Sequence, residues 1–333
     1  MPPATRTWTP GRPVDVRAVL SALRRGPADP AMRLADDGTT WRATRTPDGP
    51  ALLHLRPRPT SGDVEATAWG PGAHWTLDGV PELLGEADTT ATEFRPRPEH
   101  RRLVEAWRRR PGWRVPRSRA VTETLVAAAL EQVVTGQEAR RSWRRLLHRY
   151  GEHAPGPTGP GEAAEGMRVP PAPADWLAVP SWDWLQAGVE ERRRRVVRTA
   201  AGRAGALERT LALNHADAER ALRSLPGVGV WTAAEVRHRA HGDPDAFSFA
   251  DYHVSRDVSW ALTGEVLDDA GCAEVIACYA GHRYRVQRLL ELAGERRPRR
   301  GPRMTLPTHL PGHLPSRPLS EPPGRPAVRR GAR

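Results

Sequence analysis

The stretch SLPGVGVWTAAEV, residues 224–236, places two glycines between two segments with helical patterns. ADAERALRSL precedes the glycines and WTAAEVRHRA follows them, so the pattern predicts two helices joined by a tight turn. Glycine readily adopts positive φ, and such a turn leaves backbone N–H groups free at the start of the second helix. Those groups could hold a phosphate, although a glycine-rich turn between helices is more often only a helix cap.

A single aspartate follows this turn in an apolar and aromatic stretch. Asp251 lies twenty residues after Trp231, within FSFADYHVS. An ionised carboxylate in such surroundings suits chemistry that develops a positive charge. Taken alone, Asp251 could equally cap the next helix.

The composition favours a polyanionic partner. The chain has 333 residues, with 51 lysine and arginine residues against 39 aspartate and glutamate residues, which gives a net charge of +12. Such a charge is typical of proteins that bind nucleic acid or an anionic membrane surface. Lysine is absent altogether, so part of the arginine bias could reflect composition rather than binding.

The sequence gives little support for a membrane protein or for a cysteine-ligated metal site. No stretch reaches the roughly 18 consecutive apolar residues of a membrane span, and the N-terminal residues lack the apolar core of a signal peptide. We therefore expect a cytoplasmic, nucleoid-associated protein. Two cysteines, Cys272 and Cys278, are too few for a four-cysteine iron–sulfur cluster or a zinc ribbon.

Three parts of the chain differ in pattern. Residues 1–115 combine an amphipathic helix over 15–26 with the strand-like runs TTWRATR, ALLHLRPR and DVEATAWG, which predicts a small α+β domain. Residues 116–294 are mainly helical, from the buried VTETLVAAALEQVV to the amphipathic HRYRVQRLLELAG, and predict an all-α domain. Residues 295–333 are rich in proline and arginine, and we expect a disordered tail.

These motifs resemble those of a known family. LPGVGVWTA followed by GDPDAFSFADYHV resembles the hairpin and the Gly/Pro-then-Asp signature of the helix-hairpin-helix DNA glycosylases, in particular the 3-methyladenine DNA glycosylase II branch. TETLVAAALEQVVTGQEA and YAGHRYRVQRLLELAG are similar to the opening and closing helices of its catalytic domain. The resemblance implies a TATA-binding-protein-like α+β domain over 1–115 and an all-α helix-hairpin-helix glycosylase domain over 116–294.

The resemblance assigns roles to several residues. Asp251 would be the catalytic carboxylate, and Trp231 a wall of the pocket for a flipped base, unless its ring merely packs against the hairpin. Glu235 and His282 stand where relatives have aromatic residues; they would join this pocket, although Glu235 could face solvent. The residues that would bind DNA phosphate lie in the hairpin: Gly227, Val228, Gly229, Trp231 and Thr232.

Two further positions bear on the reaction. Val133 falls on the family's intercalating wedge, which fills the gap left by a flipped base, although a valine in an apolar helix is also typical of core packing. Glycosylases of this superfamily that also nick the strand use a lysine at the position of Trp231. Because no lysine exists, a Schiff base could form only on the N-terminal amine.

The sequence therefore predicts a monofunctional DNA glycosylase that excises alkylated purines of the 3-methyladenine and 7-methylguanine type. We expect double-stranded DNA as its partner, a monomer, no required cofactor, and at most a monovalent cation at the hairpin. The rival hypothesis is a noncatalytic helix-hairpin-helix protein that binds DNA structure, motivated by the substitutions at Glu235 and His282.

Overall fold

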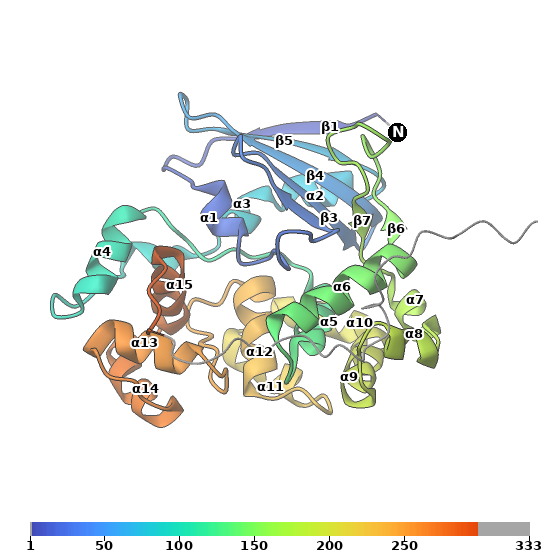
Figure 1. The fold of residues 1–333 in the computed structure, drawn as a ribbon. Coiled ribbons are helices and arrows are strands. Elements are labelled where there is room, and N and C mark those ends of the chain that lie inside the picture. The colour runs from blue at the N-terminus through green and yellow to red at the C-terminus, as the bar shows by residue number, and fades with distance from the viewer. Residues whose placement is uncertain (1, 299–333) are drawn as a thin grey trace, which may run out of the picture. The chain divides into compact units, whose positions relative to one another are not determined.

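Five antiparallel strands form the main sheet, in the order β1-β5-β4-β3-β2 (Figure 1). The computed structural model describes residues 2–298. The strands are β1 (Ala4–Trp8), β2 (Met32–Leu34), β3 (Thr40–Thr46), β4 (Gly49–Pro57) and β5 (Val64–Trp69). The register of the hairpin β3–β4 pairs Thr46 with Gly49, and Gly49 takes φ 121°, which a tight turn between these strands requires. The predicted strands are thus confirmed, and β1 and β2 are added to them.

Short helices accompany the sheet. They are α1 (Val16–Leu20), α2 (Ala73–Asp78), α3 (Val80–Leu83) and α4 (Arg101–Arg109), with a 3₁₀ turn, η1 (Thr89–Thr92). The side chain of Asp15 caps α1 as predicted, but the helix ends well before Gly26. Beyond the helix end, the Asp29 carboxylate accepts the N–H of Arg25.

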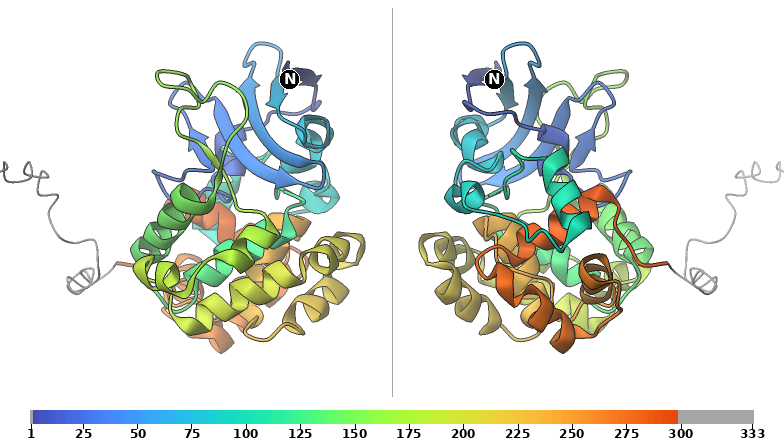
Figure 2. Two further views of the ribbon diagram at one scale, coloured as in Figure 1. Left: turned by 90° about the vertical axis from the view of Figure 1, so that its right-hand side faces the viewer. Right: turned by 90° about the vertical axis from the view of Figure 1, so that its left-hand side faces the viewer.

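Residues beyond the sheet are almost entirely helical, which confirms the predicted fold class of an α+β part followed by an all-α part. The helices lie on one side of the sheet in the views of Figures 1 and 2. They are α5 (Val121–Glu131), α6 (Gly136–Tyr150), α7 (Pro173–Ala178), α8 (Ser181–Gln186), α9 (Glu191–Gly202), α10 (Ala204–Arg209), α11 (His215–Arg223), α12 (Val230–Val236), α13 (Val254–Thr263), α14 (Asp269–Ile276) and α15 (Arg283–Ala293). Two 3₁₀ turns, η2 (Thr210–Ala212) and η4 (Ala277–Tyr279), and a short π-helix, η3 (Arg237–His241), complete the helical part.

The proline- and glycine-rich passage after α6 is not a plain loop. It contains two short antiparallel strands, β6 (Glu152–His153) and β7 (Arg168–Val169). Ala154, Ala164 and Met167 from this passage pack with Trp41 and Leu52 of the sheet. The passage therefore covers the sheet face that would otherwise expose these apolar side chains.

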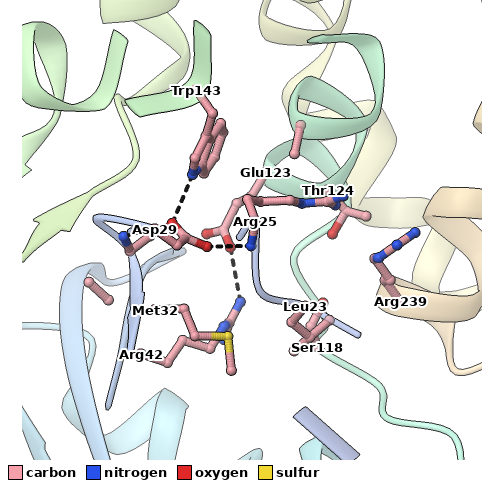
Figure 3. A pocket seen from close by; sticks show the side chains of 13 residues that line it. Leu23, Arg25, Asp29, Met32, Arg42, Ser118, Glu123, Thr124, Trp143 and Arg239 are labelled. Carbon is pink, nitrogen blue, oxygen red and sulfur yellow. Dashed lines mark hydrogen bonds and ion pairs between the residues drawn. The ribbon is translucent and has the colours of Figure 1, made fainter. Parts of the chain in front are cut away.

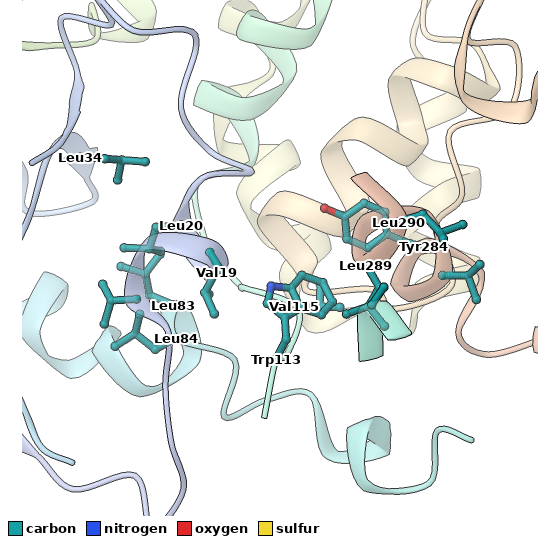
Figure 4. Packing of buried hydrophobic residues seen from close by; sticks show 14 of the residues in the cluster. Val19, Leu20, Leu34, Leu83, Leu84, Trp113, Val115, Tyr284, Leu289 and Leu290 are labelled. Atoms are coloured by element: carbon teal, nitrogen blue, oxygen red, sulfur yellow. The ribbon is translucent and has the colours of Figure 1, made fainter. Parts of the chain in front are cut away.

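Two large apolar cores hold the molecule together. One is built around α5, which is buried nearly all round as its apolar sequence predicted, and includes Trp143 of α6 and Leu222 of α11. The other joins the sheet side to the last helices: Leu20 and Trp113 belong to the same cluster as Leu289 (Figure 4). Residues before 116 and residues after 246 thus share one continuous core.

The predicted disordered tail, residues 295–333, lies outside the described residues from Arg299 onward. Just before that point, Arg297 donates to Asp257 in α13 at 2.6 Å. Within residues 2–298, none of the helices is both long and apolar enough to cross a membrane.

Candidate active site and DNA-contacting loops

The glycine turn joins α11 to α12 as predicted. Asn214 caps α11 by accepting the N–H of Asp217. Gly227 takes φ 83°, and a Cβ at this position would lie 2.5 Å from Cγ2 of Val196, so both conformation and space require glycine. Val228 is buried beneath the turn, whereas Gly227 and Gly229 are exposed. The turn therefore presents backbone to solvent while its side chains anchor it in the core.

Asp251 contacts the hairpin through Trp231. Its Oδ2 accepts the indole N–H of Trp231 at 3.2 Å, and its Oδ1 accepts the backbone N–H groups of His253 at 2.7 Å and Val254 at 3.1 Å. One carboxylate oxygen thus caps α13 and the other faces the first turn of α12. The interpretation of Asp251 as a helix cap thus describes part of this geometry, and its catalytic role stays a prediction.

The backbone next to Asp251 is strained. Ala250 takes φ 64°, and its N–H is held by the Asp269 carboxylate at 2.8 Å. Among residues 2–298, three non-glycine residues have positive φ, namely Arg119, Val133 and Ala250. Such residues cost on the order of 1 to 3 kcal/mol and cluster at functional segments. Two of the three lie at, or directly beside, positions that the sequence singled out.

Val133 forms the tip of the turn between α5 and α6. Its side chain is 83% exposed and its φ is 53°, which is rare for a β-branched residue. The alternative interpretation of Val133, packing in the core, is therefore wrong, because its side chain is exposed. An exposed apolar tip is the geometry that a wedge would need.

The base of this turn is held by hydrogen bonds from residues that the sequence analysis did not single out. Arg25 donates to both carboxylate oxygens of Glu131 at 2.9 Å, and Arg193 donates to the carbonyl of Leu130 at 3.0 Å. Gln132, directly before the tip, is buried and donates to the hairpin. A polar residue at the end of an apolar helix is a weak signal, so these ties were not predictable from one sequence.

No protein-family model matches the chain. A probable bifunctional transcriptional activator/DNA repair enzyme AlkA of Mycobacterium tuberculosis is 29% identical over 239 residues, which cover 67% of this chain and 44% of that protein. A 3-methyladenine DNA glycosylase from Archaeoglobus fulgidus has the same fold, with a TM-score of 0.70 at 16% identity over 87% of this chain and 98% of that one. By distant homology and fold, the chain is AlkA-like.

The fold is also shared with a protein whose structure was solved with bound DNA. An 8-oxoguanine glycosylase/lyase of Clostridium acetobutylicum, solved with double-stranded DNA, gives a TM-score of 0.60 at 12% identity over 84% of this chain and 91% of that one. These likenesses confirm the resemblance to the helix-hairpin-helix DNA glycosylases that the hairpin motif predicted. The chain spans less than half the length of the curated mycobacterial relative.

Glu235 is buried and does not face solvent. Its carboxylate accepts the hydroxyl of Ser248 at 2.7 Å and pairs with Arg239 one turn later along the chain. Burial would raise the pKa of Glu235, but the charge of Arg239 together with the Ser248 hydrogen bond lowers it to about 2. Glu235 is therefore the ionised centre of a buried polar network.

His238 belongs to the same network. Its ring stacks on Tyr284 with centroids 3.9 Å apart, and burial together with the neighbouring Arg239 lowers its pKa to about 3. A neutral His238 ring fits between Tyr284 and the charged pair without adding a second buried cation.

His282 lies directly before α15 and contacts other residues than Trp231. Its ring meets Phe94 edge-on with centroids 5.3 Å apart, and its Nδ1 accepts from Arg285 at 3.2 Å. Burial lowers its pKa. The structure thus brings Trp231 and Asp251 into direct contact, whereas Glu235 and His282 are engaged by Arg239 and Arg285.

One small pocket lies between the sheet side and the helices, and Asp251 does not line it (Figure 3). It is crossed by hydrogen bonds from Trp143 to Asp29 and from Arg42 to Glu123, both drawn in the figure. Its volume of about 30 Å³ accommodates only a water or two. Ligand pockets are roughly tenfold larger. We therefore interpret this pocket as a polar contact between the sheet side and the helices, and not as a ligand site.

The strain at Val133 leads to a prediction about stability. Val133→Asn is expected to raise the free energy of unfolding by about 0.5 to 1 kcal/mol, because asparagine tolerates positive φ and the exposed valine buries little. Chemical denaturation measures the change. Val266→Asn is the control, since Val266 is also exposed but lies outside the positive-φ residues. An equal gain in both variants would show that the backbone of Val133 is not the cause.

Proposed function

We propose that the chain is a DNA glycosylase that releases alkylated purines, of the 3-methyladenine and 7-methylguanine type, from double-stranded DNA and so starts base-excision repair. The observation that carries this proposal is the contact between Asp251 Oδ2 and the indole of Trp231 at the start of α12. It places a carboxylate and an aromatic ring side by side next to the glycine hairpin. The homology to a DNA repair protein and the fold of a 3-methyladenine glycosylase support it.

In the proposed reaction, the bond between C1′ of the deoxyribose and the purine nitrogen breaks and its electron pair leaves with the base. Water adds to C1′ and loses a proton to Asp251 or to solvent. An alkylated purine is already cationic, so it leaves without further protonation. The part of the substrate that needs stabilisation is therefore the sugar, where the Asp251 carboxylate stabilises oxocarbenium character. Trp231 stacks on the electron-poor ring of the base.

In this proposal the hairpin turn binds the DNA backbone, and Val133 fills the gap that the flipped base leaves in the base stack. The exposed backbone at Gly227 and Gly229 supports a phosphate contact, and the exposed Val133 supports a wedge. A monovalent cation at the hairpin would share its carbonyls, because Gly227 O already accepts from Gln132 and Leu225 O from the N–H of Val228. Each carbonyl retains a second lone pair for such an ion.

The test is release of free 3-methyladenine and 7-methylguanine from methylated duplex DNA by the wild-type chain. Release of either base supports the proposal. Tight binding to the same duplex without release would favour the rival, a noncatalytic binder in which Asp251 serves only as the cap of α13 that Oδ1 already provides.

We further propose that the enzyme has no lyase activity, because the chain contains no lysine. Borohydride reduction in the presence of an abasic duplex is expected to trap no covalent complex, and strands should break only after alkali. Trp231→Lys is the informative second variant, because an amine at this position would face the sugar and is expected to introduce trapping. Efficient trapping by the wild-type chain would contradict the proposal.

A further inference from the structure

Two adjacent residues at the α5–α6 turn carry a conformational or polar cost. Val133 has φ 53°, and Oε1 of Gln132 is buried with no hydrogen-bond partner among the described residues. A buried amide oxygen without a partner is uncommon in native proteins, as is a β-branched residue at positive φ. Such features persist where the surrounding structure enforces them, and they are frequent at functional segments.

The other end of the Gln132 amide explains what enforces this geometry. Its Nε2 donates to the carbonyl of Gly227 at 2.9 Å and to Oγ1 of Thr232 at 2.8 Å. Both donors of the amide are therefore used on the hairpin, one on the exposed turn and one on the first turn of α12. The residue directly before the Val133 tip is tied to both parts of the hairpin.

We propose that Gln132 is a positioning residue that fixes the Val133 side chain in register with the hairpin. A duplex gripped at the Gly227 turn would then meet the wedge at one fixed separation along its backbone. The proposal rests on the proposed function for its DNA substrate, but it concerns the bound duplex and not the cleavage of the base.

The neighbouring anchors make this role specific to Gln132. Arg25 and Arg193 hold the last turn of α5, and the capping box of Thr135 and Glu138 starts α6. These contacts set the two helix ends, whereas the Gln132 amide sets where the tip stands relative to the hairpin. Loss of the amide should leave both helices intact and release the tip.

The first experiment measures wedge insertion without excision. A duplex carries a stable abasic analogue with 2-aminopurine beside it, and fluorescence reports the unstacking that insertion causes. Gln132→Met preserves length and volume but removes both hydrogen bonds. It is expected to weaken the preference for the abasic duplex over undamaged DNA about tenfold, with a smaller fluorescence change at saturation.

A variant on the hairpin side checks that the contact itself is responsible. Thr232→Val removes one of the two acceptors and should show a partial effect. The double variant should lose no more preference for the abasic duplex than Gln132→Met alone, because both substitutions remove the same hydrogen bond between Gln132 and Thr232. Gln186→Ala, at an exposed glutamine in α8, is the control and should behave as wild type. Thermal denaturation confirms that each variant is folded.

The second experiment compares excision from two duplexes, one with the alkylated purine opposite its normal partner and one with it opposite an abasic site. Flipping from the second duplex needs less help from a wedge. Gln132→Met should lose about tenfold on the first duplex and less than about twofold on the second. A merely structural role would reduce both rates equally.

Each outcome of these experiments either supports or overturns the positioning role of Gln132. Equal losses on the two duplexes, additive effects of the Gln132 and Thr232 variants, or an unchanged fluorescence response in Gln132→Met would overturn the positioning role, as would a wild-type chain that leaves the fluorescence unchanged. If the wild type releases no purine but its fluorescence response depends on Gln132, the proposed glycosylase activity fails and the positioning role stands.

Discussion

Asp251→Asn is expected to lower the single-turnover rate of purine release from methylated duplex DNA at least about a hundredfold. Asparagine retains an oxygen that can accept the N–H groups of His253 and Val254, so the cap of α13 survives. It lacks the negative charge that would stabilise the sugar cation. DNA affinity and the thermal midpoint should therefore change little while the rate falls.

Asp268→Asn is the matched control for this variant. Asp268 caps the nearby helix α14 by accepting the N–H of Gly271, and asparagine can do the same. Its rate should stay within about twofold of wild type. Equal rate losses in the Asp251 and Asp268 variants would mean that Asp251 acts only as a cap. Retained release in Asp251→Asn would remove it from the proposed catalytic role.

Glu235→Ala is expected to cost about 3 kcal/mol of unfolding free energy, because it leaves the partly buried Arg239 without its counterion and the Ser248 hydroxyl without its acceptor. Chemical denaturation at neutral pH measures the loss. Exposed Glu274→Ala should cost less than about 0.5 kcal/mol and serves as the control. An unchanged stability combined with a changed preference between 3-methyladenine and 7-methylguanine would instead place Glu235 in the base pocket.

The same variant has an expected pH dependence. The pKa of Glu235 is lowered from 4.5 to about 2 in the folded chain, so its stabilising effect is complete above pH 4.5 and is lost as the pH falls toward 2. The difference in stability between wild type and Glu235→Ala should therefore narrow within that window. A difference that stays constant down to pH 2 would mean that Glu235 is not held in its ionised form.

Motifs with strong local patterns were predictable from the sequence. The glycine turn between α11 and α12, the buried helix α5 and the closing helix α15 follow from spacing and apolar periodicity. The strands β3, β4 and β5 were also recognisable from their composition and turns. β1 escaped prediction because its residues are mostly exposed, so no alternation of burial marks it.

The site could be predicted only in part, because its geometry depends on contacts between distant segments. The positions of Asp251 and Val133 follow from the family motif, but the strain at Ala250 and the exposure of Val133 are set by tertiary structure. Glu235 was assigned to a pocket or to solvent. Its pairing with Arg239 is an i to i+4 relation visible in the sequence, whereas its burial against Ser248 is not.

The core that joins Leu20 and Trp113 to Leu289 has a consequence for how the chain matures on the ribosome. Residues before 116 emerge early in synthesis, yet the apolar core to which they contribute also contains residues of α15, the last helix that the structure describes. Contacts of such large sequence separation slow folding. The nascent chain must therefore carry an incompletely covered apolar surface until α15 emerges, and in that interval we expect it to need chaperones most.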